Sequence, residues 1–153
     1  MDQPTLLFIP GAWHAADGFE DVRASLASRK IKNPTIALLL PSIGAEPPKK
    51  GLADDTLHVH NEIEKLVEQG KKVVVIAHSS GGMVGAGAVK GLSCSERKQE
   101  EKKSGVIILV YMAAFVSLKG GSLLGMLGGK YFTMDESTGM LDSQYRLGEL
   151  ERV

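Results

Sequence analysis

The chain has 153 residues, of which 43% are hydrophobic and 24% charged, and its formal net charge is zero. This apolar content excludes a disordered chain, and the balanced charge gives no general case for binding nucleic acid or an anionic membrane. Cys94 is the only cysteine, the N-terminus does not resemble a signal peptide, and no apolar run approaches the roughly 20 residues that span a bilayer. We therefore expect one cytoplasmic, globular protein.

The first half of the chain alternates short apolar runs with amphipathic segments. Strands buried on both faces are predicted at Thr5–Ile9 and over residues 35–40, because each is a continuous apolar run that ends at a proline. Helical spacing of apolar residues predicts a helix over residues 18–30. A second helix is predicted over residues 52–69, with an acidic first turn and Gly70 as its C-terminal cap.

The second half continues the same alternation. Residues 73–77 and 106–116 predict two further strands, with a small-residue helix over 81–92 and a charged surface loop over 93–104 between them. Beyond residue 117 no firm periodicity is present. Alternating strands and helices predict an α/β fold with a mostly parallel sheet between two helical layers, in a single domain spanning residues 1–153.

One segment carries a chemical motif. The strand at residues 73–77 runs into Ala77-His78-Ser79-Ser80-Gly81 and then into the predicted helix. Small residues two positions before and after a serine, between a strand and a helix, are typical of a nucleophile elbow, a sharp turn that exposes the serine hydroxyl. The alternative is a glycine-rich turn whose serines only cap the helix.

A second sequence motif supports the interpretation as a nucleophile elbow. The apolar run Thr5–Ile9 is followed by Pro10, Gly11, Ala12, Trp13 and His14. The pair PGAWH and AHSSGG resembles the AB hydrolase-1 type of the α/β-hydrolase superfamily, in particular its methylesterase and hydroxynitrile-lyase branch and the fungal relatives of that branch. The resemblance covers about the first 120 residues. It implies hydrolysis of a small ester or related acyl bond, as in a carboxylesterase.

The resemblance also implies roles for individual residues. Ser79 is the expected nucleophile, and the backbone N–H groups of Ala12 and Ser80 are the expected donors of the oxyanion hole. The pocket candidates are Trp13, His14 and His78. Residues 117–153 would be the start of a cap region or an irregular tail.

The rest of the triad is not expected in this chain. In the superfamily an acid and then a histidine follow the nucleophile, whereas no histidine follows Ser79 here. His58 and His60 fall on the predicted helix over 52–69, which we expect far from the elbow. Asp135, Glu136 and Asp142 follow no recognisable strand and are not assigned. The resemblance therefore implies an N-terminal part that lacks the last strands, the triad acid and the triad histidine.

Several alternatives follow from these observations. The chain is either a piece of a serine hydrolase or a non-catalytic small-molecule binding or interaction protein derived from the same fold. A nucleotide-binding protein fits poorly, because the glycines of residues 81–87 match neither common phosphate-binding pattern. No spacing suits a metal, and no cofactor is expected. The strand over 106–116 would expose a hydrophobic edge, which predicts self-association unless the C-terminal tail covers it.

Overall fold

A computed structural model describes residues 3–47, 49–118, 121–126, 133–134 and 141–142. The chain forms two compact units, Met1–Val116 and Ser117–Val153. The strands of the first unit are β1 (Thr5–Ile9), β2 (Thr35–Ala37), β3 (Lys72–Ser79) and β4 (Gly105–Ala114). Its helices are η1 (Ala16–Phe19, a 3-10 turn), α1 (Glu20–Ser28), α2 (Leu52–Glu68), α3 (Gly81–Ala88) and α4 (Cys94–Lys98). The described residues of the second unit form α5 (Leu123–Met126) and the antiparallel pair β5 (Thr133–Met134) and β6 (Leu141–Asp142).

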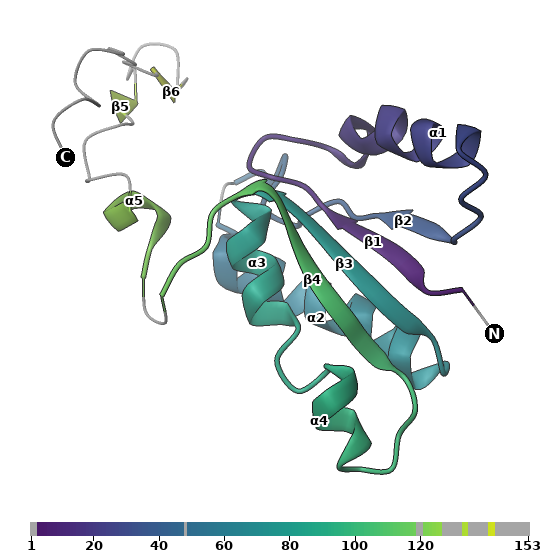
Figure 1. Cartoon of the computed structure of the whole chain (residues 1–153). Coiled ribbons are helices and arrows are strands. Elements are labelled where there is room, and N and C mark those ends of the chain that lie inside the picture. Colours follow the sequence, from purple (N-terminus) through teal and green to yellow (C-terminus); the bar gives the residue numbers. More distant parts are fainter. Residues whose placement is uncertain (1–2, 48, 119–120, 127–132, 135–140, 143–153) are drawn as a thin grey trace, which may run out of the picture. The chain divides into compact units, whose positions relative to one another are not determined.

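The four strands of the first unit form a parallel sheet in the order β2-β1-β3-β4 (Figure 1). Ile9 pairs with Ala77, and Ala77 pairs with Tyr111, so the carboxyl ends of the three longer strands meet at one edge of the sheet. Each crossover between parallel strands contains a helix, as this pairing requires. The predicted α/β fold with a parallel sheet is confirmed.

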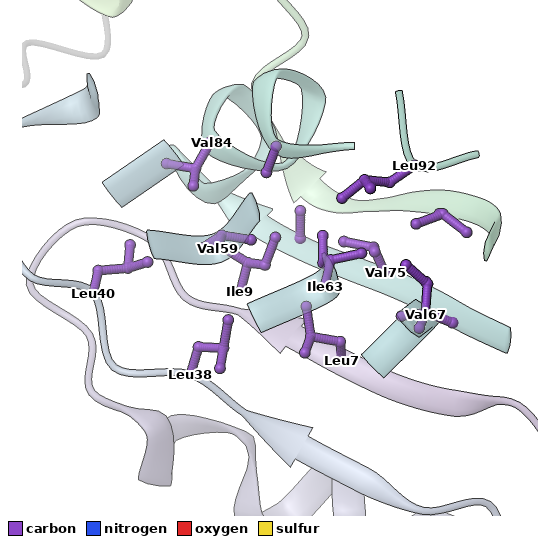
Figure 2. Packing of buried hydrophobic residues seen from close by; sticks show 14 residues of the cluster. Leu7, Ile9, Leu38, Leu40, Val59, Ile63, Val67, Val75, Val84 and Leu92 are labelled. Atoms are coloured by element: carbon purple, nitrogen blue, oxygen red, sulfur yellow. The ribbon is translucent and has the colours of Figure 1, made fainter. Parts of the chain in front are cut away.

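The main core lies between this sheet and the helices α2 and α3. Successive side chains of a strand point to opposite faces, so Leu7 and Ile9 face these helices while Phe8 faces away. In α2 the residues Val59, Ile63 and Val67 recur every fourth position and form one apolar stripe. Figure 2 shows side chains of the helices and strands meeting in this layer. The fully buried members of the cluster include Leu7, Ile9, Val59, Ile63, Val73, Val75, Ala77 and Ala88.

The opposite face of the sheet contacts the segment between β1 and β2. The Phe8 ring lies 5.0 Å from the ring of Phe19, measured between centroids. The predicted helix over residues 18–30 is thus a 3-10 turn, which buries Phe19, followed by α1. These contacts give the expected three layers, with α2 and α3 together on one side of the sheet (Figure 1).

Two predictions about individual elements are wrong. The strand expected over residues 35–40 is only the three residues of β2, and they are half-buried rather than buried. The reason is position: β2 pairs with β1 alone in the described sheet, so its other side is open. Leu38 and Leu40, which follow it, are buried without belonging to a strand.

The charged segment over residues 93–104 is not simply a surface loop, since it contains α4. Ser93 begins the helix with a reciprocal cap, in which its hydroxyl accepts from the Glu96 N–H and the Glu96 carboxylate accepts from the Ser93 N–H. Arg97 is buried, donating from Nε to the Ser104 carbonyl at 2.8 Å and from a terminal nitrogen to Glu68 at 2.9 Å. The hydrogen bond from Arg97 is the main reason that the pKa of Glu68 is lowered from its usual value.

Strand β4 lies at the edge of the described sheet. Ile107 and Ile108 are about half exposed, at 50% and 52%. Self-association through this edge stays a prediction. None of the helices among the described residues is long and apolar enough to cross a membrane.

Candidate functional site

The turn that follows β3 has an unusual backbone conformation. Ser79 is the last residue of β3 and has a φ of 52°, in the left-handed region. Helix α3 begins two residues later, at Gly81. For a residue with a side chain this conformation costs roughly 1–2 kcal/mol. The Ser79 carbonyl accepts a hydrogen bond from the Phe115 N–H at 3.0 Å, which connects the turn to the segment after β4.

The loop after β1 packs against this turn at backbone distance. A Cβ atom placed on Gly11 would lie 2.6 Å from Ser79 Cβ and 3.1 Å from Ser79 Oγ. A Cβ atom on Gly81 would lie 2.5 Å from the Pro10 carbonyl oxygen and 2.8 Å from that of Ile9. The shortest distance at each position, 2.6 Å for Gly11 and 2.5 Å for Gly81, is below the 3.0 Å that real Cβ contacts keep, so any larger residue would force the two segments to shift. The two sequence motifs therefore meet through their glycines.

A hydrogen bond joins the same two segments. The Ala12 N–H donates to Ser80 Oγ at 2.7 Å, across 68 positions of sequence. His14 Nδ1 lies 2.8 Å from the Ala12 carbonyl oxygen. Because a carbonyl oxygen can only accept, Nδ1 carries the proton in this bond, and Nε2 is the nitrogen left for other partners. Trp13, between them, has a φ of 63° and is 70% exposed.

A cavity of about 200 Å³ opens at the same end of the sheet. The His14 and His78 rings meet edge to face in its wall, with centroids 5.5 Å apart and planes at 86°. The residues that line the cavity are His14, Ala15, Gly18, Phe19, Val22, His78 and Met112. It thus combines an apolar lining with two imidazoles that can donate or accept hydrogen bonds.

The structure brings most of the predicted site residues together. Ala12 and His14 come from the loop after β1, and His78, Ser79 and Ser80 come from the end of β3, which pairs with β1. Trp13 belongs to the same loop, although the residues that line the cavity do not include it.

The other histidines and the unassigned carboxylates lie elsewhere or outside the described residues. His58 and His60 belong to α2, and His60 Nδ1 lies 2.8 Å from the Ala88 carbonyl oxygen at the end of α3. Asp135 and Glu136 are outside the described residues, and Asp142 lies in β6 of the second unit.

Sequence reasoning missed part of this site. Phe19 and Val22 were expected only as a helical stripe, and Met112 only as a strand residue, yet all three line the cavity. The Ser80 hydroxyl was considered as a helix cap, but no capping hydrogen bond from its side chain is present and its partner is Ala12. Within the part of the chain that the structure describes, no group of three or more His, Cys, Asp or Glu residues is arranged to hold a metal ion.

Comparison with known proteins assigns the chain to a family. Residues 6–148 match the model of the alpha/beta hydrolase family. The chain is 31% identical over 127 residues to the alpha/beta hydrolase nvfD of Aspergillus novofumigatus, covering 83% of this chain and 49% of that protein. It is 29% identical over 132 residues to a probable hydrolase of a Phoma species, covering 85% and 50% respectively.

Solved structures show the same fold. Polyneuridine aldehyde esterase superposes with a TM-score of 0.59 at 20% identity, covering 83% of this chain and 46% of the esterase. Tomato methylketone synthase I, solved with 2-tridecanone, gives a TM-score of 0.59 at 15% identity, covering 92% and 55%. This chain spans about half the length of the curated relatives that it matches. The parallel sheet, the strained turn and the family match together establish that the chain belongs to the alpha/beta hydrolase family.

Proposed function

We propose that the chain carries the nucleophile and oxyanion-hole part of a serine hydrolase active site, with Ser79 as the nucleophile. The observation that carries this proposal is the left-handed backbone of Ser79 where a parallel strand passes into a helix. Backbone strain at a residue with a side chain persists where the surrounding structure enforces it, and it clusters at functional sites. Here Gly11 and Gly81 enforce it by admitting the loop after β1 against the turn.

The proposed oxyanion donors are the backbone N–H groups of Ala12 and Ser80. The contact of Gly11 with Ser79 supports the first, because the next N–H along the loop is that of Ala12. The second belongs to the residue directly after the nucleophile, as the elbow requires. Two fixed donors stabilise the negative charge that develops on the carbonyl oxygen when the serine adds to it. Loss of one such donor typically costs about 100- to 1,000-fold in rate.

The proposed substrate is a small ester or related acyl compound, cleaved as by a carboxylesterase. The cavity of about 200 Å³ supports a compound with a short apolar group, since Phe19, Val22 and Met112 are among its lining residues. His14 and His78 in the same wall are placed to hydrogen bond to an ester oxygen of the same compound. The small volume of the cavity favours a short acyl chain over a long one.

The acid and the base of the triad are proposed to come from sequence outside these 153 residues. No histidine follows Ser79 in the sequence, and the chain spans about half of its curated relatives. Without a general base a serine hydroxyl is a weak nucleophile. We therefore expect slow turnover from these 153 residues alone, limited to what substrate binding and the oxyanion hole provide.

A fluorophosphonate probe, which phosphonylates activated serines, tests the proposal. The 153-residue chain and the product of the longest reading frame that contains it are each compared with their Ser79→Ala variants. We expect strong labelling of the longer product, weak labelling of the 153-residue chain, and none of either variant. Labelling that persists in the variants would contradict the role of Ser79. A longer product that folds but does not label would favour a non-catalytic binding or interaction protein.

A further inference from the structure

The side chain of Ser80 joins the turn after β3 to the loop after β1. Its Oγ accepts the hydrogen bond of the Ala12 N–H at 2.7 Å, at the short end of the range for such bonds. Ser80 stands at the N-cap position of α3, where a serine usually caps its own helix. Its φ of −61° and ψ of −20° are helical, however, and its side chain makes no capping bond. The hydroxyl is therefore directed across to the loop after β1.

We propose that Ser80 Oγ is an internal ligand of the oxyanion hole, occupying the Ala12 donor while no substrate is bound. This inference rests on the proposed function, in which the same N–H receives the substrate oxygen. A backbone N–H has one proton, so a substrate oxygen bound there at full strength must replace Ser80 Oγ. The Ala12 N–H then contributes to substrate binding only the difference in free energy between its hydrogen bond to the substrate oxygen and its hydrogen bond to Ser80 Oγ.

Only a side-chain rotation is needed to open the donor. The backbone of the turn is held by the left-handed Ser79 and by Gly81, which is wedged against the Pro10 and Ile9 carbonyls. The Ser80 N–H, as part of that backbone, keeps its position. The Ser80 hydroxyl, in contrast, has three staggered rotamers, and leaving one of them frees the Ala12 N–H. Ser80 is thus a positioning residue whose side chain sets how strongly the site binds an oxyanion.

The substitution Ser80→Ala distinguishes this proposal from a merely structural role of Ser80, because the two predict opposite effects on oxyanion binding. If the bond between Ala12 and Ser80 only clamps the loop to the turn, its removal would loosen the donor and weaken oxyanion binding. If Ser80 Oγ occupies the donor, Ser80→Ala exposes the Ala12 N–H and strengthens binding. Since a neutral hydrogen bond contributes a modest net free energy, the expected gain in affinity is about 2- to 12-fold. Ser80→Thr keeps the hydroxyl and serves as the matched control.

Phenylboronic acid is a suitable probe because it needs no general base. The Ser79 Oγ forms a bond to boron, the hydroxyl proton passes to water, and the boron becomes a tetrahedral anion whose oxygen can accept from the oxyanion donors. Calorimetric titration is carried out on the 153-residue chain and on its Ser80→Ala, Ser80→Thr and Ser79→Ala variants. We expect tighter binding by Ser80→Ala, wild-type affinity for Ser80→Thr, and no binding by Ser79→Ala.

The outcomes distinguish a failure of the inference about Ser80 from a failure of the proposed function. Binding that depends on Ser79 but is equal or weaker in Ser80→Ala overturns the inference about Ser80 and leaves the proposed function standing. Absence of Ser79-dependent binding in both the wild-type chain and Ser80→Ala overturns the proposed function and the inference with it. Hydrogen exchange of the Ala12 amide is a second readout of the resting bond. We expect faster exchange in Ser80→Ala than in the wild type or Ser80→Thr, and equal exchange in all three would overturn the inference.

Discussion

The contact between Gly81 and the end of β1 gives a sharp test of how the site is held. In Gly81→Ala the new Cβ atom would lie 2.5 Å from the Pro10 carbonyl oxygen and 2.8 Å from that of Ile9. The shortest ordinary van der Waals contact of such an atom is about 3.4 Å, so the two distances fall short of it by roughly 0.9 and 0.6 Å. Both opposing atoms belong to the backbone of β1 and its loop, so no side chain can rotate away.

The expected cost follows from overpacking at a rigid contact, which is typically about 1–3 kcal/mol. Alanine is a better helix former than glycine by up to about 1 kcal/mol, which offsets part of this cost at the start of α3. We expect a net loss of about 1–2 kcal/mol in the free energy of unfolding, and a Tm lowered by about 2–8 °C. Circular dichroism during thermal and urea unfolding measures both quantities.

Gly18→Ala is the matched control for this substitution. Gly18 lies in η1 and lines the cavity, but a Cβ atom there would have nothing within 4 Å. Its stability should be unchanged or slightly higher, because alanine restricts the unfolded chain. If Gly81→Ala were as stable as Gly18→Ala, the close approach of loop and turn would not be rigid. The account of Ser79 as a residue held in strain would then fail.

Three further expectations follow from contacts in the structure. Arg97→Met should lower the free energy of unfolding by about 2 kcal/mol in urea denaturation, because the buried Ser104 carbonyl loses its donor; Arg97→Lys, which retains the charge without the planar fork, should recover only part of it. The hydrogen bond from the Ser93 hydroxyl lowers the pKa of Glu96 below its ordinary value of 4.5. The stabilisation by this carboxylate is therefore present above pH 4.5 and is lost as the pH falls through the lower folded-state pKa. The difference in Tm between wild type and Glu96→Gln should therefore be constant above that pH and shrink below it, and a difference that grew on acidification would contradict this sign. Ser79→Gly should be about 1 kcal/mol more stable than Ser79→Ala in thermal unfolding, because glycine alone adopts a φ of 52° without penalty, whereas equal stabilities would show that the turn relaxes.

Periodicity and turn residues in the sequence were sufficient to predict the main elements. Continuous apolar runs predicted β1, β3 and β4, and the stripe of Val59, Ile63 and Val67 predicted α2. The order of these elements predicted the parallel sheet, because crossover helices allow little else. The sequence does not predict α4 although its cap is local, because the run of charges around it is typical of a solvated loop.

The candidate site, like the fold, is predicted only in part by the sequence. Local spacing singled out Ser79 between a strand and a helix, and the loop at Gly11 and Ala12, because a sharp turn demands small residues in sequence order. Only the tertiary structure decided that Gly11 lies against Ser79, that Ala12 donates to Ser80 Oγ, and that Phe19 and Met112 share a cavity with the two histidines. These interactions bring together residues up to 98 positions apart in the sequence, as His14 and Met112 are in the cavity wall. They arise from the pairing of β1, β3 and β4, which no local pattern of residues encodes.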